Sequence, residues 1–393
     1  MQVVIVGGGV MGAATAWFLA RQHGIRALVL ERDLGYQWAS SARSVCAIRQ
    51  QFSTAINIRV SQASLLFYRD FAAQLDLGSD APALGLTEPG YLYLTATAEG
   101  ASRLRSHQQL QHAHGVPTCL LDPEAITTRY PWMQVADLTL GSLGVSTASS
   151  GEGWFDGYAA LQGFRQAAMR QGVAFREASV TDFVVEGDQV TGVRTTGGDV
   201  VPADVVVLTA GAWSGALASL IGIDLPVRGR KRDVFAVESS LHVTDAPLVI
   251  DPSGVWFRPE QEPGLFFCGA PPRSEDADDL PLDAVDHGLF TEVIWPVLAA
   301  RVPAFDALKV RTSWAGYYEM NTVDHNGLVG TVAPYANLFT ACGFSGHGLQ
   351  QAPAVGRGLA ELIATGRYTS LDLSPFRVSR LAEGEPLLER NVI

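Results

Sequence analysis

The sequence is poor in the features that mark several broad classes of protein. Its 393 residues include 28 Lys and Arg against 40 Asp and Glu, giving a formal net charge of −12 at pH 7. Because a phosphate backbone is bound by clustered basic side chains, we do not expect a nucleic-acid partner. The longest apolar runs, such as residues 205–208, have the length of a strand. They are far too short for a membrane span, so no integral membrane segment is expected.

Cysteine is scarce as well, and its spacing excludes two further classes. The four cysteines are scattered without C-x-x-C spacing, at Cys46, Cys119, Cys268 and Cys342. Neither a zinc site nor a disulfide framework is expected, and no histidines stand at metal-ligand spacing, so we predict no metal. Met1 leads almost directly into the first predicted strand, leaving no room for a signal peptide. We therefore expect a cytoplasmic protein with reduced thiols.

The first 31 residues show the pattern of a dinucleotide-binding β-α-β unit. An uncharged, β-branched run at residues 3–6 predicts a strand that is covered on both faces. The pattern G-x-G-x-x-G follows at once, at Gly7, Gly9 and Gly12. Small residues then predict a helix, and a second apolar strand ends at Glu31.

Each part of this unit has a physical task. Gly7 allows the tight turn, Gly9 lets the backbone approach a pyrophosphate, and Gly12 allows close packing of helix and strand. The positive end of the helix then holds the anion, while Glu31 can accept both hydroxyls of an adenosine ribose. Because this acid disfavours a 2′-phosphate, we expect FAD or NAD rather than NADP. The alternative is a glycine-rich turn that binds nothing.

Two later stretches repeat the transition from a buried strand to small residues. Residues 205–208 run into Thr209-Ala210-Gly211-Ala212-Trp213, and residues 338–342 run into a glycine-rich loop followed by a helix. We therefore predict an α/β (α+β two-domain) chain, with a discontinuous Rossmann-like FAD-binding domain and an inserted β-rich substrate domain. The expected segments are 1–80, 150–222 and 322–393 for the first domain, and 81–149 and 223–321 for the second.

Five smaller expectations concern the rest of the chain. We expect a helix from about residue 56 to 75 and a Gly/Ser-rich linker at residues 141–151. The basic run at residues 228–232 is interpreted as a solvated loop entering a strand. Residues 275–279 should form an exposed acidic turn. Pro353 should lie in the first turn of the last helix.

Three motifs together resemble the D-amino-acid oxidase/glycine oxidase/sarcosine oxidase (DAO) family of FAD enzymes. They are the N-terminal glycine pattern, the turn at residues 209–213 and the loop at residues 343–348. Residues 48–52, 314–318 and 343–351 are most similar to the branch of the FAD-dependent oxidoreductase domain-containing proteins and the sarcosine dehydrogenase-like proteins. The resemblance covers essentially the whole chain.

The resemblance implies a flavin whose N5 takes a hydride from the carbon next to a substrate nitrogen. The resulting imine would then be hydrolysed by water. The implied substrate is a small amino acid or an N-alkyl or cyclic amino acid, such as glycine, sarcosine, a D-amino acid or a proline-like compound. The electron acceptor is left open among oxygen, a quinone and an electron-transfer protein. The choice between a single subunit and an oligomer is open too.

Departures from the family pattern bear on the cofactor and the substrate. Members with a covalent flavin carry a cysteine or histidine that residues 315–318 and 40–42 lack here, which implies non-covalent FAD. Tyr318 stands where an arginine of related enzymes holds the substrate carboxylate, and Gln350 stands where a lysine is found. Arg49 is the remaining candidate for the carboxylate, with a structural salt bridge as the alternative.

The candidate site residues follow from these comparisons. We expect a role in catalysis or substrate binding for Arg49, Tyr318, His347 and Gln350, although His347 can also be a hydrogen-bonded loop histidine. The residues expected to contact FAD are Gly7, Gly9, Val10, Met11, Gly12, Glu31, Arg32, Ser40, Ser41, Val180, Ala210, Gly211, Trp213, Gly343, Ser345, Gly346, His347, Gly348, Leu349 and Gln350.

Two other functions compete with an amino-acid oxidoreductase. One is a flavoprotein that serves as an assembly or scaffold factor without turnover, and bleaching of the flavin by a substrate would discriminate against it. The other is an NAD-dependent dehydrogenase, which a yellow purified protein would exclude.

Overall fold

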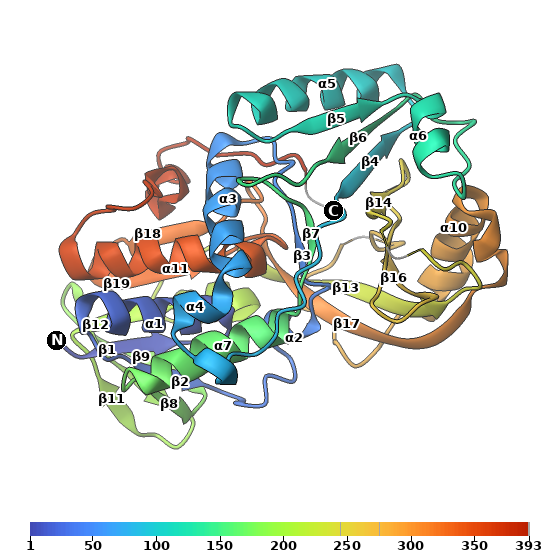
Figure 1. The fold of residues 1–393 in the computed structure, drawn as a ribbon. Helices are drawn as coiled ribbons and strands as arrows, with labels where there is room; N and C mark the ends of the chain where they lie inside the picture. The colour runs from blue at the N-terminus through green and yellow to red at the C-terminus, as the bar shows by residue number, and fades with distance from the viewer. Residues whose placement is uncertain (244, 275, 392–393) are drawn as a thin grey trace.

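The computed structural model describes residues 1–243, 245–274 and 276–391 (Figure 1). Its first large sheet is parallel except at one edge, where β18 runs antiparallel to β19. Both central strands, β1 and β12, are apolar and buried along their whole length, as a sheet covered on two faces requires. The strand order is β18 (Leu328–Val332), β19 (Tyr335–Cys342), β12 (Val205–Leu208), β1 (Val3–Val6), β2 (Leu28–Glu31) and β8 (Ala174–Glu177).

Helices cover one face of this sheet, and a small antiparallel sheet covers the other. Helix α1 (Val10–His23) packs between α11 (Gly348–Thr365) and α7 (Gly157–Arg170), so the first and last helices lie side by side (Figure 1). The opposite face packs against a three-stranded sheet in which β10 (Gln189–Thr195) lies between β9 (Val180–Glu186) and β11 (Val200–Pro202). The N-terminal, middle and C-terminal parts of the chain thus share one core.

The second large sheet is mixed and carries a separate aromatic core. Phe235, Phe257 and Phe305 are buried there, under α10 (Trp295–Arg301). This sheet takes its strands from the inserted segments of the chain. Their order is β17 (Lys309–Asn321), β13 (Val227–Glu238), β16 (Leu265–Gly269), β15 (Trp256–Pro259), β14 (Leu248–Ile250), β4 (Tyr91–Thr95), β6 (Leu140–Gly144) and β5 (Thr118–Leu121).

A long two-stranded ribbon joins the two sheets. β13 and β17 pair antiparallel from Val227 opposite Asn321 to Glu238 opposite Lys309. Near its end, β17 forms a further bridge between Met320 and Phe344, in the loop that follows β19. The ribbon therefore carries residues of the second sheet to the start of α11.

The structure corrects several sequence expectations. The stretch expected to be a linker begins in β6, whose five residues are all buried. Gly141 lies against Ile126 and Leu92, and Gly144 lies against the side chain of Glu152. The helix expected over residues 56–75 breaks at Asp70 into α3 (Ala55–Arg69) and α4 (Phe71–Leu75). Pro353 lies inside α11 rather than in its first turn.

The basic run is also placed differently from expectation. Residues 228–232 belong to β13, and two of the arginines pair with acids of the stretch interpreted as an exposed turn. Arg232 forms a bidentate pair with Asp276, and Arg230 pairs with Asp278 at 2.9 Å. Residue 275 of that stretch lies outside the described residues.

Two general findings complete the fold. Across residues 1–243, 245–274 and 276–391, no helix combines the length and apolar character needed to cross a bilayer. All four cysteines are free thiols.

The C-terminal segment is anchored by a buried ion pair. Arg380, in the short helix η6 (Val378–Arg380), donates from Nε and Nη2 to the carboxylate of Asp324 at 2.8 and 2.9 Å. Both side chains are buried. Asp324 also accepts from the backbone N–H of Leu387, so the pair ties the last part of the chain to the end of β17.

We predict that Arg380→Met lowers the free energy of unfolding by about 3–5 kcal/mol, because it leaves the Asp324 carboxylate buried without its cation. Denaturant unfolding followed by circular dichroism measures this loss. Arg103→Ala is the matched control, because it breaks an exposed pair with Glu99 and should cost less than about 1 kcal/mol. Equal losses in the two variants would contradict the prediction.

Candidate functional site

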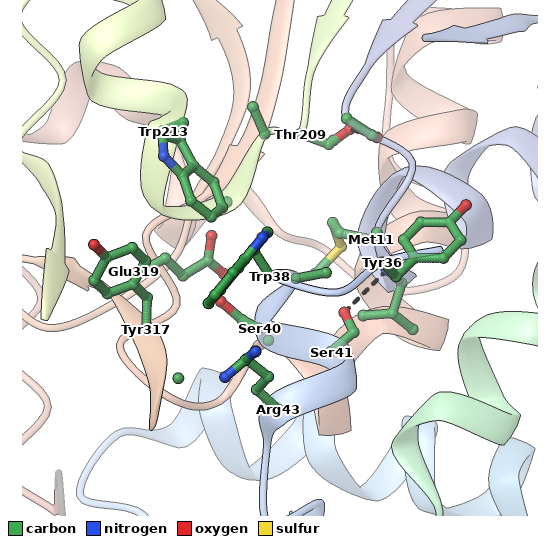
Figure 2. A pocket seen from close by; sticks show the side chains of 18 of the residues that line it. Met11, Tyr36, Trp38, Ser40, Ser41, Arg43, Thr209, Trp213, Tyr317 and Glu319 are labelled. Atoms are coloured by element: carbon green, nitrogen blue, oxygen red, sulfur yellow. Dashed lines mark hydrogen bonds between the residues drawn. The ribbon is translucent and has the colours of Figure 1, made fainter. Parts of the chain in front are cut away.

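The three glycine-containing motifs meet at one cavity of about 510 Å³ (Figure 2). Its wall is formed by the start of α1, the end of β2, the short helix α2 (Ser40–Arg43), the turn η2 (Gly211–Trp213), the end of β17 and the start of α11. Elements more than three hundred residues apart in sequence therefore enclose the same space. The volume lies in the range of small-molecule and cofactor pockets.

The glycines of the first motif are required for different reasons. Gly7 has φ +99°, and a Cβ there would lie 2.5 Å from the carbonyl oxygen of Thr209. A Cβ on Gly12 would lie 2.0 Å from the carbonyl oxygen of Gly7. A Cβ on Gly9 would meet only Ser41 Oγ, at 3.7 Å. Gly7 and Gly12 thus allow the close packing of the loop, whereas Gly9 leaves the cavity open.

The N-terminus of α1 points its backbone N–H groups toward this space. No acidic side chain stands in the first turn of α1, which the structure describes throughout. Ser41 Oγ accepts from the N–H of Val10 at 3.2 Å, and Met11 also lines the cavity. Free N–H groups and the positive end of the helix favour an anion such as a pyrophosphate here.

Glu31 is held in the cavity wall by backbone donors. Its Oε2 accepts from the N–H of Gly8 at 2.8 Å, and its Oε1 from the N–H of Asp33 at 3.1 Å. Burial raises the pKa of Glu31, and these hydrogen bonds oppose the rise. Because each carboxylate oxygen accepts more than one hydrogen bond, capacity is left for two hydroxyl donors. Next to it, the Arg32 guanidinium lies 3.7 Å from the ring centroid of Trp213.

The remaining expected cofactor residues fall into two groups. Those that line the cavity are Ser40, Ser41, Val180, Ala210, Gly211, Trp213, Gly346, Gly348 and Leu349. Gly343 and Ser345 lie behind the wall. Ser345 accepts from the N–H of Asn321 through Oγ at 3.0 Å and donates its own N–H to the carbonyl of Glu319 at 3.0 Å. These two residues shape the loop before α11.

Three of the four residues expected to take part in catalysis or substrate binding form a cluster outside the described cavity wall. The N–H of Arg49 donates to Gln350 Oε1 at 2.7 Å, and Arg49 Nη2 lies 2.8 Å from His347 Nε2. The guanidinium also donates to the carbonyls of Gln51 and Asn391. The structure brings Arg49, His347 and Gln350 together, and their catalytic roles stay predictions.

The hydrogen bond to Arg49 defines the state of His347. A guanidinium has only donors, so His347 Nε2 accepts and the ring is neutral. Burial and the positive charge of Arg49 hold the pKa of His347 well below its usual range. While the hydrogen bond from Arg49 is kept, the lone pair of His347 Nε2 is not available to accept a proton from a substrate.

Tyr318 is the member of the predicted set that reaches the cavity. Its ring lies against Gly346, where a Cβ would be 2.7 Å from the ring, and Gly346 has φ +90°. Burial raises the pKa of Tyr318, opposed by the charges of Arg232 and Arg49. The phenol is therefore a neutral hydrogen-bonding group at physiological pH.

Sequence reasoning missed several residues of the wall. The residues missed are Trp38, Arg43, Arg232, Trp256 and Glu319, which all line the cavity. Figure 2 labels Trp38, Arg43 and Glu319 among the side chains of the wall. Glu319 could have been predicted from the sequence, because this acid directly follows the motif at residues 314–318. The other four could not be found without the places of β13 and β15 in the second sheet and the path of the loop after β2.

A sequence model of the DAO family, described as FAD dependent oxidoreductase, matches residues 2–362. The chain belongs to this family. FAD is therefore its cofactor, and the geometry fits it, because the cavity combines an open glycine position, a helix N-terminus and a held carboxylate at the end of β2.

Relatives and solved structures agree with this membership. FAD-dependent oxidoreductase domain-containing protein 1 of Xenopus laevis is 40% identical, over 100% of this chain and 84% of the relative. Sarcosine oxidase subunit beta of an Arthrobacter species is 27% identical, over 97% of this chain and 91% of the relative. The structure of L-proline dehydrogenase from P. horikoshii has a TM-score of 0.85 at 26% identity, covering 98% of both chains. The predicted mixed α/β fold is confirmed.

Substitutions at two glycines should separate cofactor binding from folding. We predict that Gly9→Val folds but binds no FAD, because φ of −59° suits any residue and the side chain enters the cavity. Gly12→Val should be unstable as well as FAD-free, since its Cβ meets the Gly7 carbonyl. Absorbance of bound flavin and thermal unfolding distinguish the two. Full FAD occupancy in Gly9→Val would contradict the assignment of this loop.

Proposed function

We propose that this DAO-family flavoprotein oxidises the C–N bond of a small amino acid or of an N-alkyl or cyclic amino acid. The observation that carries the proposal is the continuity of the cavity, which runs from the glycine motifs to Tyr318, Arg232 and Trp256 at the second sheet. The names of two relatives, sarcosine oxidase and L-proline dehydrogenase, support a secondary amino acid as substrate.

Bound FAD would supply a two-electron acceptor beside that C–N bond. The chain's own part is to bind and orient the substrate and to exclude water. Val234, Trp256 and Ala270 give the far end of the cavity an apolar wall, suited to the carbon skeleton of a small substrate. Tyr318 offers a hydroxyl to one of the substrate's polar groups.

Two arginines are candidates for the substrate carboxylate. Arg49 is the sequence prediction, and its guanidinium is engaged by His347 and by two backbone carbonyls. Arg232 lines the cavity and lies 5.1 Å from the ring centroid of Tyr318. Its Nη atoms are fixed by Asp276, while its buried Nε has no hydrogen-bond partner among the described residues. Arg232 is favoured because its side chain lines the cavity beside Tyr318, whereas Arg49 lies outside the described wall.

Anaerobic titration with small amino acids tests the function, and arginine variants test the carboxylate site. We predict that sarcosine, proline or a similar compound bleaches the flavin absorbance. Arg232→Lys should keep the flavin spectrum but weaken substrate binding by about 2–5 kcal/mol, since a lysine lacks the planar guanidinium that Asp276 holds in the cavity wall. Arg49→Lys should weaken it less.

The same titration decides between the alternatives. If Arg49→Lys weakens substrate binding more than Arg232→Lys does, Arg49 is the residue that binds the substrate carboxylate, as predicted from the sequence. A flavin that no amino acid or amine bleaches would favour the non-catalytic scaffold. The electron acceptor, the cytoplasmic location and the oligomeric state stay predictions, and repeating the titration with oxygen or a quinone present addresses the first of them.

The attachment of FAD is proposed to be non-covalent. Residues 315–318 and 40–42 offer no cysteine or histidine. Cys46 follows the cavity residue Val45, and burial raises the pKa of its thiol to about 11, which disfavours the reactive thiolate. We predict that acid precipitation leaves the yellow colour in the supernatant. Colour that stays with the pellet would show that a covalent bond exists.

A further inference from the structure

Glu319 is an acid of the cavity wall that the proposed function does not use. It lies in β17, directly after Tyr318 and before the bridge from Met320. A Cβ built on Gly348 would lie 2.9 Å from its Oε1, and one built on Gly211 would lie 3.7 Å from its Oε2. The carboxyl group therefore lies between two of the three cofactor motifs, facing the same space as Trp213 (Figure 2).

The surroundings of Glu319 disfavour its charged form. Burial raises the pKa of Glu319 to about 7, and only the N–H groups of Gly343 and Phe344 oppose the rise. Cys342 of β19 faces the Glu319 carboxyl group. Burial and the charge of Glu319 raise the pKa of the Cys342 thiol. No cation of the described residues lowers the pKa of Glu319.

The charged groups of the neighbouring ribbon strand are directed to other partners. Gly229 is the residue of β13 opposite Glu319. Arg228 donates to backbone carbonyls and lies within 4.0 Å of Asp278. Arg230 pairs with the same acid at 2.9 Å.

The remaining charged groups near the cavity are likewise held elsewhere. Arg232 is paired with Asp276, and Arg32 lies over the Trp213 ring. Arg43, which also lines the cavity, donates to the backbone carbonyls of Gln37 and Ala315. His347, in the loop before α11, is neutral and bonded to Arg49. Glu319 is thus a titratable group in the cofactor cavity whose charge is fixed by no cation of the described residues.

We propose that Glu319 takes up one proton from solvent when FAD bound in this cavity is reduced. Reduction by two electrons, from a substrate or an electrode, adds negative charge beside the carboxylate, and the interaction is strong in a water-poor cavity. An O–H bond forms on Glu319, and the O–H bond of the solvent hydronium ion that supplies the proton breaks. The inference rests on FAD binding in this cavity and on no particular substrate.

The test is the pH dependence of the midpoint potential of the holoprotein, measured by spectroelectrochemistry from about pH 6 to about pH 9. One extra proton changes the equilibrium constant about tenfold per pH unit, which is 29.6 mV for a two-electron couple. We expect this extra slope in the unsubstituted protein, above the pH at which Glu319 ionises in the oxidised state. Glu319→Gln should lack it, whereas Glu99→Gln, on an exposed helix, should retain it.

Protons bound by the flavin itself are common to all three proteins, so the difference in slope isolates the carboxyl group. Equal slopes in the unsubstituted protein and in Glu319→Gln with FAD bound would overturn the proposal. If Glu319→Gln fails to hold FAD, the reduced-minus-oxidised infrared spectrum of the unsubstituted protein decides. A band of a newly protonated carboxyl, shifted in Glu319→Asp, is expected, and its absence would overturn the inference. Since an electrode drives the reduction, failure of the proposed substrates would leave this result intact.

Discussion

The structure depends on the close approach of two loops, one after β1 and one after β12. The backbone around Gly7 touches Thr209 so closely that a Cβ would lie 2.5 Å from its carbonyl oxygen. The Thr209 side chain donates to the carbonyl of Gly7 at 2.8 Å, and the Thr209 N–H donates to Val6. This contact brings the first and second motifs to the same edge of the sheet, where the carboxyl ends of parallel strands bind ligands.

The long ribbon of β13 and β17 imposes the second constraint. Since the two strands stay paired over their whole length, the end of β17 is delivered to the loop before α11. Tyr318 and Glu319 point to opposite sides of that strand, because side chains alternate in a β-strand. One contacts Gly346, and the other lies beside Gly348 and Gly211. β17 therefore contributes two successive side chains, Tyr318 and Glu319, to different parts of the cavity wall.

The parts of the site that were predicted from sequence are those whose residues follow one another along the chain. The glycine pattern, Glu31 and the later strand-to-turn transitions are local signals, and the structure has each at the cavity. Local signals failed where pairing with distant strands decided the outcome. Residues 141–144 look like a linker but are buried in β6, and the basic run looks solvated but pairs with acids about forty residues away.

The case of Arg49 shows why function is harder to predict than fold. Its position in the sequence indicated a residue that faces the substrate, and the chain supplies the expected neighbours, His347 and Gln350. The sequence did not predict that Asn391 would lie next to Arg49, where its backbone carbonyl accepts a hydrogen bond from the same guanidinium. An arginine has a limited number of donors, so each protein acceptor reduces what is left for a ligand. Arg232 is paired with Asp276, but its side chain lines the cavity, whereas Arg49 lies outside the described wall. The place of a cation and its partners, rather than its presence in a motif, therefore decide whether it can serve the site.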